Sequence, residues 1–276
     1  MKASPKISII TACYNCSAHL EHLIDSVKAQ SYADWELIVV DDASIDHTHS
    51  TLRIYGDLQG KLIKLRNQRN LGPGASRNRG IHRARGDYIA ILDADDICVP
   101  HRLERQIDFL LFNPDIDVLG SGVEAIDQQG RSLEYRYRPE THDELAARIF
   151  YENPFYHSTV MARRRFFKKS GGYHPRYRRC QDYDLWLRTF AKFRFHNLQE
   201  PLVRYRVRDT VSWQSACYSS VVLLAAMRRE RILKRNWWIA FRSPVRKLLE
   251  RIPHSGLLSR IAGVYHRKKR FSLKIL

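Results

Sequence analysis

Three aspartates stand within four positions at the end of the most apolar run of the chain, "YIAILDADD". They are Asp93, Asp95 and Asp96. The Asp-Ala-Asp spacing projects two carboxylates from one tight turn, and hard divalent cations such as Mg²⁺ and Mn²⁺ prefer oxygen ligands. A solvated turn in which Asp95 or Asp96 caps a helix is the alternative. Because the acids directly follow a buried run, the pattern favours a metal site at Asp93 and Asp95.

A glycine-rich stretch, "RNLGPGASRNRG", precedes this run. It is not a P-loop, because no Gly-Lys-Ser/Thr follows, and its Gly72-x-Gly74-x-x-Arg77 lacks the third glycine of a dinucleotide fingerprint. A loop that opens a helix can still receive phosphate at the helix N-terminus. Arg77 is therefore a candidate contact for a nucleotide or diphosphate. A turn followed by a solvated helix face is the alternative.

The first half of the chain alternates between apolar strand patterns and helical patterns. We expect strands at 6–12, 35–42, 61–66, 88–93 and within 115–127, and helices at 18–30, 44–57 (with Ser44 as a possible cap), 74–84 and 100–113. This order predicts an α/β fold with a Rossmann-like, mostly parallel sheet covered by helices on both faces. Ligands bind beyond the carboxyl ends of such strands. The polar residues there are Thr11, Tyr14, Asp41, Asp42, 66–70 and 93–96.

The second half is less regular. Residues 153–167 suggest a loop that enters a strand, and 171–190 suggest a loop followed by a helix containing Leu185, Trp186 and Leu187. The segment "QDYDLWLR" places Asp182 and Asp184 at the start of that helix. After about Trp213 the pattern becomes helical and basic.

The chain has 276 residues and a formal net charge of +18. Residues 228–276 contain 15 Lys/Arg and two Asp/Glu, a net +13, so the preceding residues carry only +5. The five cysteines are odd in number and irregularly spaced, which argues against a disulfide framework and favours a reducing compartment. Cys13 and Cys16 form one C-x-x-C, for which small loop residues are favoured over a redox or zinc role. No stretch reaches the length of a membrane span, and we expect a cytoplasmic protein.

Four motifs occur together in one order: "SIITACYN" through "VVDDASIDHT", "RNLGPGASRNRGI", "GDYIAILDADD" and "QDYDLWLR". In this combination the chain resembles the family-2 glycosyltransferases, inverting enzymes with the GT-A fold, over roughly residues 4–205. The resemblance implies a nucleotide-sugar-binding half at 1–122, an acceptor-binding and catalytic-base half at 123–212, and a basic amphipathic helical tail at 213–276.

The resemblance also implies roles for individual residues. The nucleotide site would comprise Thr11, Ala12, Tyr14, Asp42, Arg77 and Asp93. Asp93 and Asp95 would form the D-x-D motif that holds Mn²⁺ or Mg²⁺. Asp182 would be the catalytic base, with Gln181 in place of the family's usual glutamate. Asp184 would cap the helix or pair with Arg188.

Two further positions remain candidates for contact with acceptor or diphosphate. His157 lies where relatives often have a histidine, although a core or loop histidine is the alternative. Arg208 stands where relatives often have a metal-contacting histidine. An arginine has no lone pair for a cation, but it can neutralise diphosphate.

The expected reaction moves one sugar from a nucleotide-diphosphate sugar, a UDP-sugar in the first instance, to a hydroxyl of a glycan or lipid-linked acceptor in bacterial surface polysaccharide synthesis. The basic tail is expected to bind an anionic membrane, which would place the protein on the inner face of the cell membrane. A tail that packs on the protein is the alternative. Two other classes, a sugar nucleotidyltransferase and a nucleic-acid-binding protein, are disfavoured. The first lacks its activation loop, and the second does not fit acids at the strand ends.

Overall fold

The computed structural model describes residues 6–207 and 213–229. The chain divides into two compact units, Met1–Thr210 and Val211–Leu276. The first unit contains the whole sheet and every predicted site residue. Of these site residues, Arg208 lies outside the described residues.

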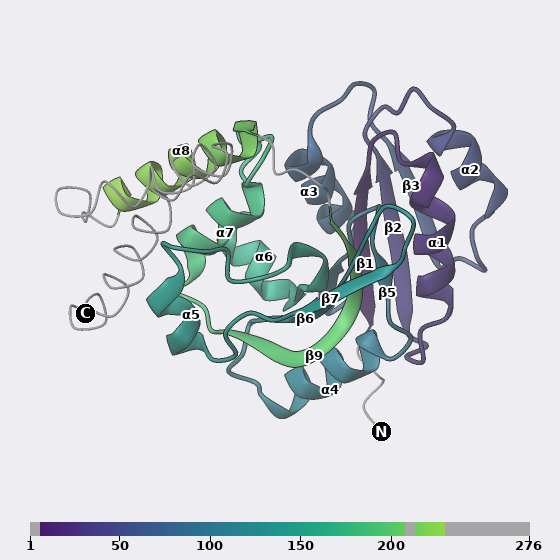
Figure 1. Cartoon of the computed structure of the whole chain (residues 1–276). Helices are drawn as coiled ribbons and strands as arrows, with labels where there is room; N and C mark the ends of the chain where they lie inside the picture. Colours follow the sequence, from purple (N-terminus) through teal and green to yellow (C-terminus); the bar gives the residue numbers. More distant parts are fainter. Residues whose placement is uncertain (1–5, 208–212, 230–276) are drawn as a thin grey trace. The chain divides into compact units, whose positions relative to one another are not determined.

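Four apolar runs of the first unit form neighbouring parallel strands, as the sequence predicts. They are β1 (Ile7–Cys13), β2 (Trp35–Asp41), β3 (Leu62–Arg66) and β4 (Tyr88–Ile91). β1 pairs with both β2 and β4, and β2 pairs with β3. Every residue of β2 and β4 is buried, which explains why these strands read as unbroken apolar runs. The carboxyl ends of the four strands therefore lie at one edge (Figure 1).

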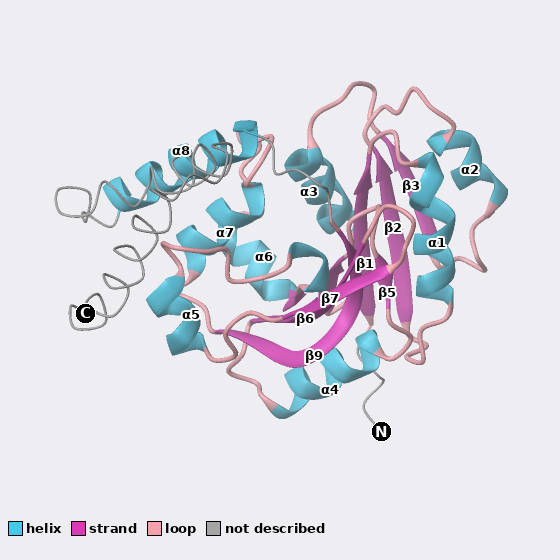
Figure 2. Cartoon of the chain, viewed as in Figure 1, coloured by secondary structure: helices cyan, strands magenta, loops and turns pink. Residues whose placement is uncertain are grey.

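Helices cover both faces of these strands (Figure 2). α1 (Ser17–Lys28) and α2 (Thr48–Ile54) pack on one face, where Leu20 and Leu52 share a buried cluster with Val39. α3 (Pro73–Arg83) packs on the other face. A Cβ at Gly80 of α3 would lie 2.8 Å from the Ile10 side chain, so this glycine permits close contact between helix and strand. The predicted α/β class is confirmed.

One expected helix start is wrong. α2 begins at Thr48 and not near Ser44. The Ser44 hydroxyl instead accepts a hydrogen bond from the Asn15 amide. Asp46 accepts from the backbone amides of Thr48 and Ser17, at 3.0 and 3.1 Å, and so serves the first turns of α2 and α1 together. The Asp46 carboxylate thus bonds the first residues of two helices, whereas a serine at position 44 cannot bond both.

The second half of the unit extends the sheet with mixed pairings. Its strands are β5 (Ile97–Cys98), β6 (Val118–Ile126), β7 (Ser132–Arg136), β8 (Met161–Arg163) and β9 (Phe195–Arg206). The order across the sheet is β3-β2-β1-β4-β8-β6-β9-β5, and β7 pairs with β6. β8 joins the two halves because it is antiparallel to both β4 and β6.

The remaining helices of this unit are α4 (Arg102–Phe112), α5 (His142–Arg148), η1 (His157–Thr159), α6 (Arg164–Ser170) and α7 (Gln181–Thr189). α7 contains the expected Leu185, Trp186 and Leu187, all buried. Trp186 lies within 6.0 Å, between ring centroids, of Phe155, Phe166 and Phe195. This aromatic cluster fixes the helix that begins beside Asp182.

In the second unit, α8 (Trp213–Arg229) is helical, as predicted. Most of the expected basic tail, residues 230–276, lies outside the described residues. Within the described ranges, no helix is both long and apolar enough to cross a membrane.

Candidate active site

The three residues predicted for the nucleotide site at the end of β1 differ in their exposure. Thr11 is fully buried, and its hydroxyl donates to the Leu92 carbonyl at 2.9 Å, which ties the end of β1 to the end of β4. Tyr14, by contrast, is 47% exposed just beyond the strand. Ala12 is half-buried between them. Of the three side chains, Tyr14 is thus the most open to a ligand, and Thr11 supports the edge of the site.

Asp42 lies just beyond β2, and its carboxylate holds the glycine-rich loop. It accepts hydrogen bonds from the Asn67 side chain at 2.6 Å and from the backbone amides of Leu71 and Gly72 at 2.8 Å each. Gly72 has φ +92°, a conformation that favours glycine, and it caps α3. Asp42 therefore positions the loop that leads to Arg77.

Asp93 and Arg77 form a buried ion pair. Arg77 Nη2 lies 2.6 Å from Asp93 Oδ1, and the Arg77 residue is 5% exposed. Burial raises the pKa of Asp93, but the Arg77 guanidinium and His157 outweigh this effect and hold that pKa well below its usual range. Asp93 is consequently ionised. Two buried nitrogens of Arg77, Nε and Nη1, have no hydrogen-bond partner among the residues that the structure describes.

His157 reaches the same aspartate from η1. Its Nδ1 lies 3.4 Å from Asp93, and its Nε2 lies 2.9 Å from the Tyr173 hydroxyl. The structure thus places this predicted residue directly beside the D-x-D turn. Tyr173 was not predicted. It lies 96 positions after Arg77 in the sequence, yet its ring is 5.8 Å from the Arg77 guanidinium.

The other two acids of the turn differ in exposure. Asp95 is half-buried, whereas Asp96 is 1% exposed. Asp96 accepts from the Ser158 hydroxyl and, at 2.7 Å, from the Arg206 backbone amide. Burial and the neighbouring charges of Asp95 and Asp93 raise the pKa of Asp96 well above its usual value. Asp96 is a structural member of the turn and caps no helix.

Arg206 and Ser158 hold the turn, and sequence reasoning missed both. Arg206 Nε donates to the Asp95 carbonyl at 3.0 Å, and Ser158 Oγ accepts from the Asp93 amide at 3.1 Å. The segment "RYRVR" alternates arginine with apolar residues. In a strand this places its arginines on one face, so the pattern could have indicated Arg206. The serine gave no such signal.

Asp182, the predicted base, lies in the first turn of α7. Its Oδ2 accepts from the Asn153 side chain at 2.6 Å, a contact between segments that the sequence did not connect. Burial lowers the pKa of Arg77, but the charge of Asp93 and, more weakly, that of Asp182 outweigh it and raise that pKa. Asp182 is therefore within electrostatic range of the Arg77–Asp93 pair. Asp184 pairs with Arg188 at 2.8 Å, as one of the two alternatives predicted.

The donor set suits a divalent cation that is completed by substrate. Within residues 6–207 and 213–229 no group of three or more His, Cys, Asp or Glu forms a full metal cage. Mg²⁺ and Mn²⁺ do not need one, because one or two carboxylates plus waters and substrate phosphates fill their shells. The ionised Asp93 and the half-buried Asp95 on one turn supply such a pair.

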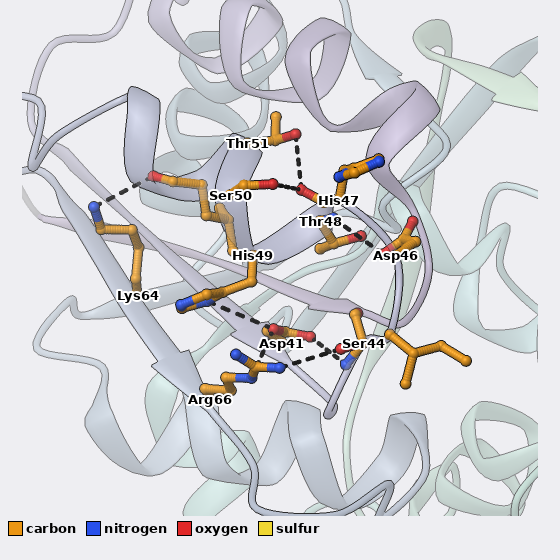
Figure 3. A network of polar contacts seen from close by, with 12 residues as sticks. Asp41, Ser44, Asp46, His47, Thr48, His49, Ser50, Thr51, Lys64 and Arg66 are labelled. Atoms are coloured by element: carbon orange, nitrogen blue, oxygen red, sulfur yellow. Dashed lines mark hydrogen bonds and ion pairs between the residues drawn. The ribbon is translucent and has the colours of Figure 1, made fainter.

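A separate polar cluster lies on the α2 side of β2 and β3 (Figure 3). It borders a cavity of about 100 Å³ lined by Asp41, His49, Leu52, Arg53, Lys64, Leu65 and Arg66. The buried Asp41 accepts from the Ser44 amide at 2.8 Å and lies 3.4 Å from Arg66 Nε. Asp41 and Asp42 are consecutive, so their side chains point to opposite sides of the strand. None of the predicted nucleotide, metal or base residues lines this cavity.

Comparison with known proteins agrees with this geometry. The family model described as glycosyl transferase family 2 matches residues 8–172. EpsE of Bacillus subtilis (strain 168), whose name places it among glycosyltransferases, is 39% identical over 241 residues, which cover 83% of this chain and 84% of EpsE.

Two solved structures show the same fold. TarS 1-349 of S. aureus in complex with UDP-GlcNAc has a TM-score of 0.65 and 22% identity, and the match covers 86% of this chain and 72% of that one. The mannosyltransferase PcManGT from Pyrobaculum calidifontis, in complex with GDP-Man and Mn²⁺, has a TM-score of 0.65 and 15% identity, with 95% and 81% covered. The fold is thus that of the GT-A glycosyltransferases, and the family match defines the chain as a glycosyltransferase. The chain belongs to glycosyl transferase family 2.

Proposed function

We propose that this glycosyltransferase moves one sugar, with inversion, from a UDP-sugar to a hydroxyl of a glycan or lipid-linked acceptor. One arrangement carries the proposal: Arg77 and Asp93 of the first half form an ion pair, and the start of α7, which contains Asp182, lies beside the start of α3. A Cβ on Gly74 of α3 would lie 3.5 Å from the Gln181 side chain. The first pair suits a diphosphate and its cation, and the second-half acid suits the acceptor. Neither half of the chain contains both the pair for the donor and the acid for the acceptor.

The donor would be held through its diphosphate. The unpartnered Nε and Nη1 of Arg77 are buried donors, and an unpaired buried N–H costs free energy that an anion would recover. Asp95, with Asp93, would hold Mn²⁺ or Mg²⁺ at the turn. Such a cation, when bound, neutralises negative charge on the diphosphate. Tyr14 is the exposed side chain at the end of β1 and would contact the nucleoside.

The acceptor would be activated by Asp182. A hydroxyl is a weak nucleophile until a base removes its proton during attack, and a carboxylate within hydrogen-bond reach can do this. Asn153 fixes one oxygen of Asp182 at 2.6 Å, which orients the carboxylate. Arg77 stabilises the charge that develops on the leaving diphosphate. A single in-line displacement inverts the anomeric centre, so an α-linked donor would yield a β-linked product.

The choice of UDP rests on similarity in fold to TarS, whose structure contains UDP-GlcNAc. The choice of a divalent cation is supported by the turn itself and by the Mn²⁺ in the PcManGT structure. The basic residues at 228–276 would bring the site to an anionic membrane surface, where each adds roughly 1 kcal/mol of attraction. A lipid-linked acceptor in surface polysaccharide synthesis, at the cytoplasmic face, fits this arrangement.

A donor screen tests the proposal. Release of nucleoside diphosphate is measured for a panel of nucleotide sugars with Mn²⁺, with Mg²⁺ and with excess EDTA, in the presence of simple glycoside acceptors. We expect release from at least one UDP-sugar that depends on the cation. Release that is unaffected by EDTA would contradict the metal role, and release from no nucleotide sugar would contradict the proposed reaction.

A further inference from the structure

The turn formed by Gly171, Gly172 and Tyr173 contacts elements of both halves of the site. We propose that this turn sets the distance between Asp182 and Asp93, with Tyr173, Asn78 and Arg188 as positioning residues. The inference rests on the proposed function, because it assigns these two aspartates to one reaction. It adds residues that bind neither donor nor acceptor.

On the donor side, Asn78 of α3 clamps the turn through its backbone. Asn78 Nδ2 donates to the Tyr173 carbonyl at 2.7 Å, and the Tyr173 amide donates to Asn78 Oδ1 at 2.9 Å. The side-chain amide thus bonds both the backbone N–H and the backbone carbonyl of Tyr173. Gly172 has φ +70°, and a Cβ there would lie 2.5 Å from Asn78 Oδ1. A side chain at position 172 would push this clamp apart.

On the base side, Arg188 of α7 holds the same turn. Its Nη1 donates to the Ser170 carbonyl at 3.0 Å and its Nη2 to the Gly172 carbonyl at 2.7 Å. Its Nε donates to Asp184 at 2.8 Å, so the guanidinium is fixed to its own helix. The planar fork of arginine makes these contacts directional. Because α7 also contains Asp182, movement of the turn and movement of the base are linked.

The Tyr173 side chain extends the link to the D-x-D turn. Its hydroxyl lies 2.9 Å from His157 Nε2, and His157 Nδ1 lies 3.4 Å from Asp93. The two ring nitrogens of His157 thus face Asp93 and Tyr173 from opposite sides of the ring. Tyr173 therefore fixes the His157 ring that faces Asp93. The residue is 1% exposed, which leaves no room for a ligand at its hydroxyl.

We expect the loss of these contacts to lower the rate of sugar transfer more than the affinity for the donor. A misplacement of about 1 Å between reacting groups can cost on the order of 100-fold in rate. The Asn78 side chain bonds the Tyr173 backbone through both Nδ2 and Oδ1, so we expect its loss to act first on the turn and not on the nucleotide site.

Four variants of the full chain separate the contacts. Asn78→Ala removes the clamp, and Asn78→Asp keeps the acceptor for the Tyr173 amide but loses the donor. Tyr173→Phe keeps the clamp and removes only the bond to His157. Tyr177→Phe is the matched control, because the Tyr177 hydroxyl makes no hydrogen bond among the described residues. The readouts are kcat for UDP release, the Kd of UDP with Mn²⁺ by calorimetry, and amide hydrogen exchange over residues 170–189 of the unliganded protein.

We expect Asn78→Ala to lower kcat by about tenfold or more, with the Kd of UDP within about threefold of wild type, and to speed exchange in 170–189. Asn78→Asp should recover part of kcat, and Tyr173→Phe should lower kcat without changing exchange. Unchanged exchange and kcat in Asn78→Ala, or a loss of UDP affinity that matches the loss of kcat, would overturn the coupling. If the wild type itself releases no UDP, the proposed function fails, and the exchange measurement still decides whether Asn78 joins α3 to α7.

Discussion

Arg77 Nη2 and Asp93 Oδ1 lie 2.6 Å apart in a buried pair at the carboxyl edge of the sheet, and both belong to the donor half of the site. The Arg77 residue is 5% exposed, and its remaining buried nitrogens have no partner within the described part of the chain. Asp93 therefore holds the Arg77 guanidinium in place. Under the proposed function the pair has both a structural and a binding role, and the two can be separated by experiment.

Arg77→Ala is expected to destabilise the protein and to weaken UDP binding. Removal of one partner leaves Asp93 as an uncompensated, partly buried charge, which costs about 3 kcal/mol. UDP affinity should fall by about tenfold or more, because charge-assisted hydrogen bonds to the diphosphate are lost. Urea unfolding and calorimetry check the two effects. Arg83→Ala, on the exposed side of the same helix, should change neither, and equal effects in both variants would contradict the assignment.

Substitutions of Asp95 and Asp96 in the D-x-D turn should differ in their effect on UDP binding, because Asp95 is half-buried and Asp96 is buried. Asp95→Asn is expected to weaken Mn²⁺-dependent UDP binding by about tenfold or more, because a neutral amide is a poorer ligand for a hard cation. Asp96→Asn should stay within about threefold of wild type, since an amide oxygen still accepts from the Arg206 backbone. Titration of UDP at several Mn²⁺ concentrations checks this. The reverse order of effects would mean that Asp96 and not Asp95 holds the cation.

Acid should remove the stabilisation that Asp46 provides. Burial raises the pKa of Asp46, but hydrogen bonds from Thr48 and Ser17 outweigh it and lower that pKa to about 2. A folded pKa below the unfolded value of 3.8 means that the stabilisation is complete above 3.8 and is lost as the pH falls toward 2. Asp46→Ala should cost about 1 kcal/mol at pH 7 and progressively less below pH 4.

Urea unfolding at pH 7 and pH 3 measures the loss of stability for Asp46→Ala. The control is Asp34→Ala, which replaces an exposed aspartate just before β2. The control should show no loss at either pH. A deficit in Asp46→Ala that is equally large at both values would show that the ionised carboxylate does not stabilise the two helix starts.

The basic tail should bind anionic vesicles. Replacement of Arg267, Lys268, Lys269 and Arg270 by glutamine removes four positive charges, each of which adds roughly 1 kcal/mol near such a surface. Sedimentation with vesicles that contain phosphatidylglycerol should show affinity lower by on the order of 1000-fold. Equal binding by both proteins, or equal binding to neutral vesicles, would contradict the membrane role.

β1, β2 and β4 could be predicted because nearly all of their residues are buried, so each reads as a short apolar run. Of the added strands, β6 lies within the predicted strand at 115–127, and β8 lies where 153–167 was predicted to enter a strand. The other three were not predicted. β5 has two residues, all five residues of β7 are half-buried or exposed, and β9 alternates polar and apolar residues while it pairs with two different strands. Their pairing depends on partners distant in the sequence, which leave no local pattern.

The residues of the candidate site also divide into those that the sequence could predict and those that it could not. Asp93, Asp95, Arg77 and Asp182 stand out because charged residues follow apolar runs or open helices. Four residues act through contacts to residues between 16 and 111 positions away: Ser158, Arg206, Asn153 and Tyr173. Such contacts form only in the folded chain, so these supporting residues were harder to predict than the candidate site residues that they hold.

The central claim is that Asp182 of the second half acts on the acceptor while the first half holds the donor. Turnover and UDP binding of Asp182→Asn test it most directly. The account predicts that kcat for UDP release falls by about 100-fold or more while the Kd of UDP with Mn²⁺ stays within about threefold of wild type. Turnover equal to that of the wild type, or a loss of UDP binding as large as the loss of turnover, would contradict it.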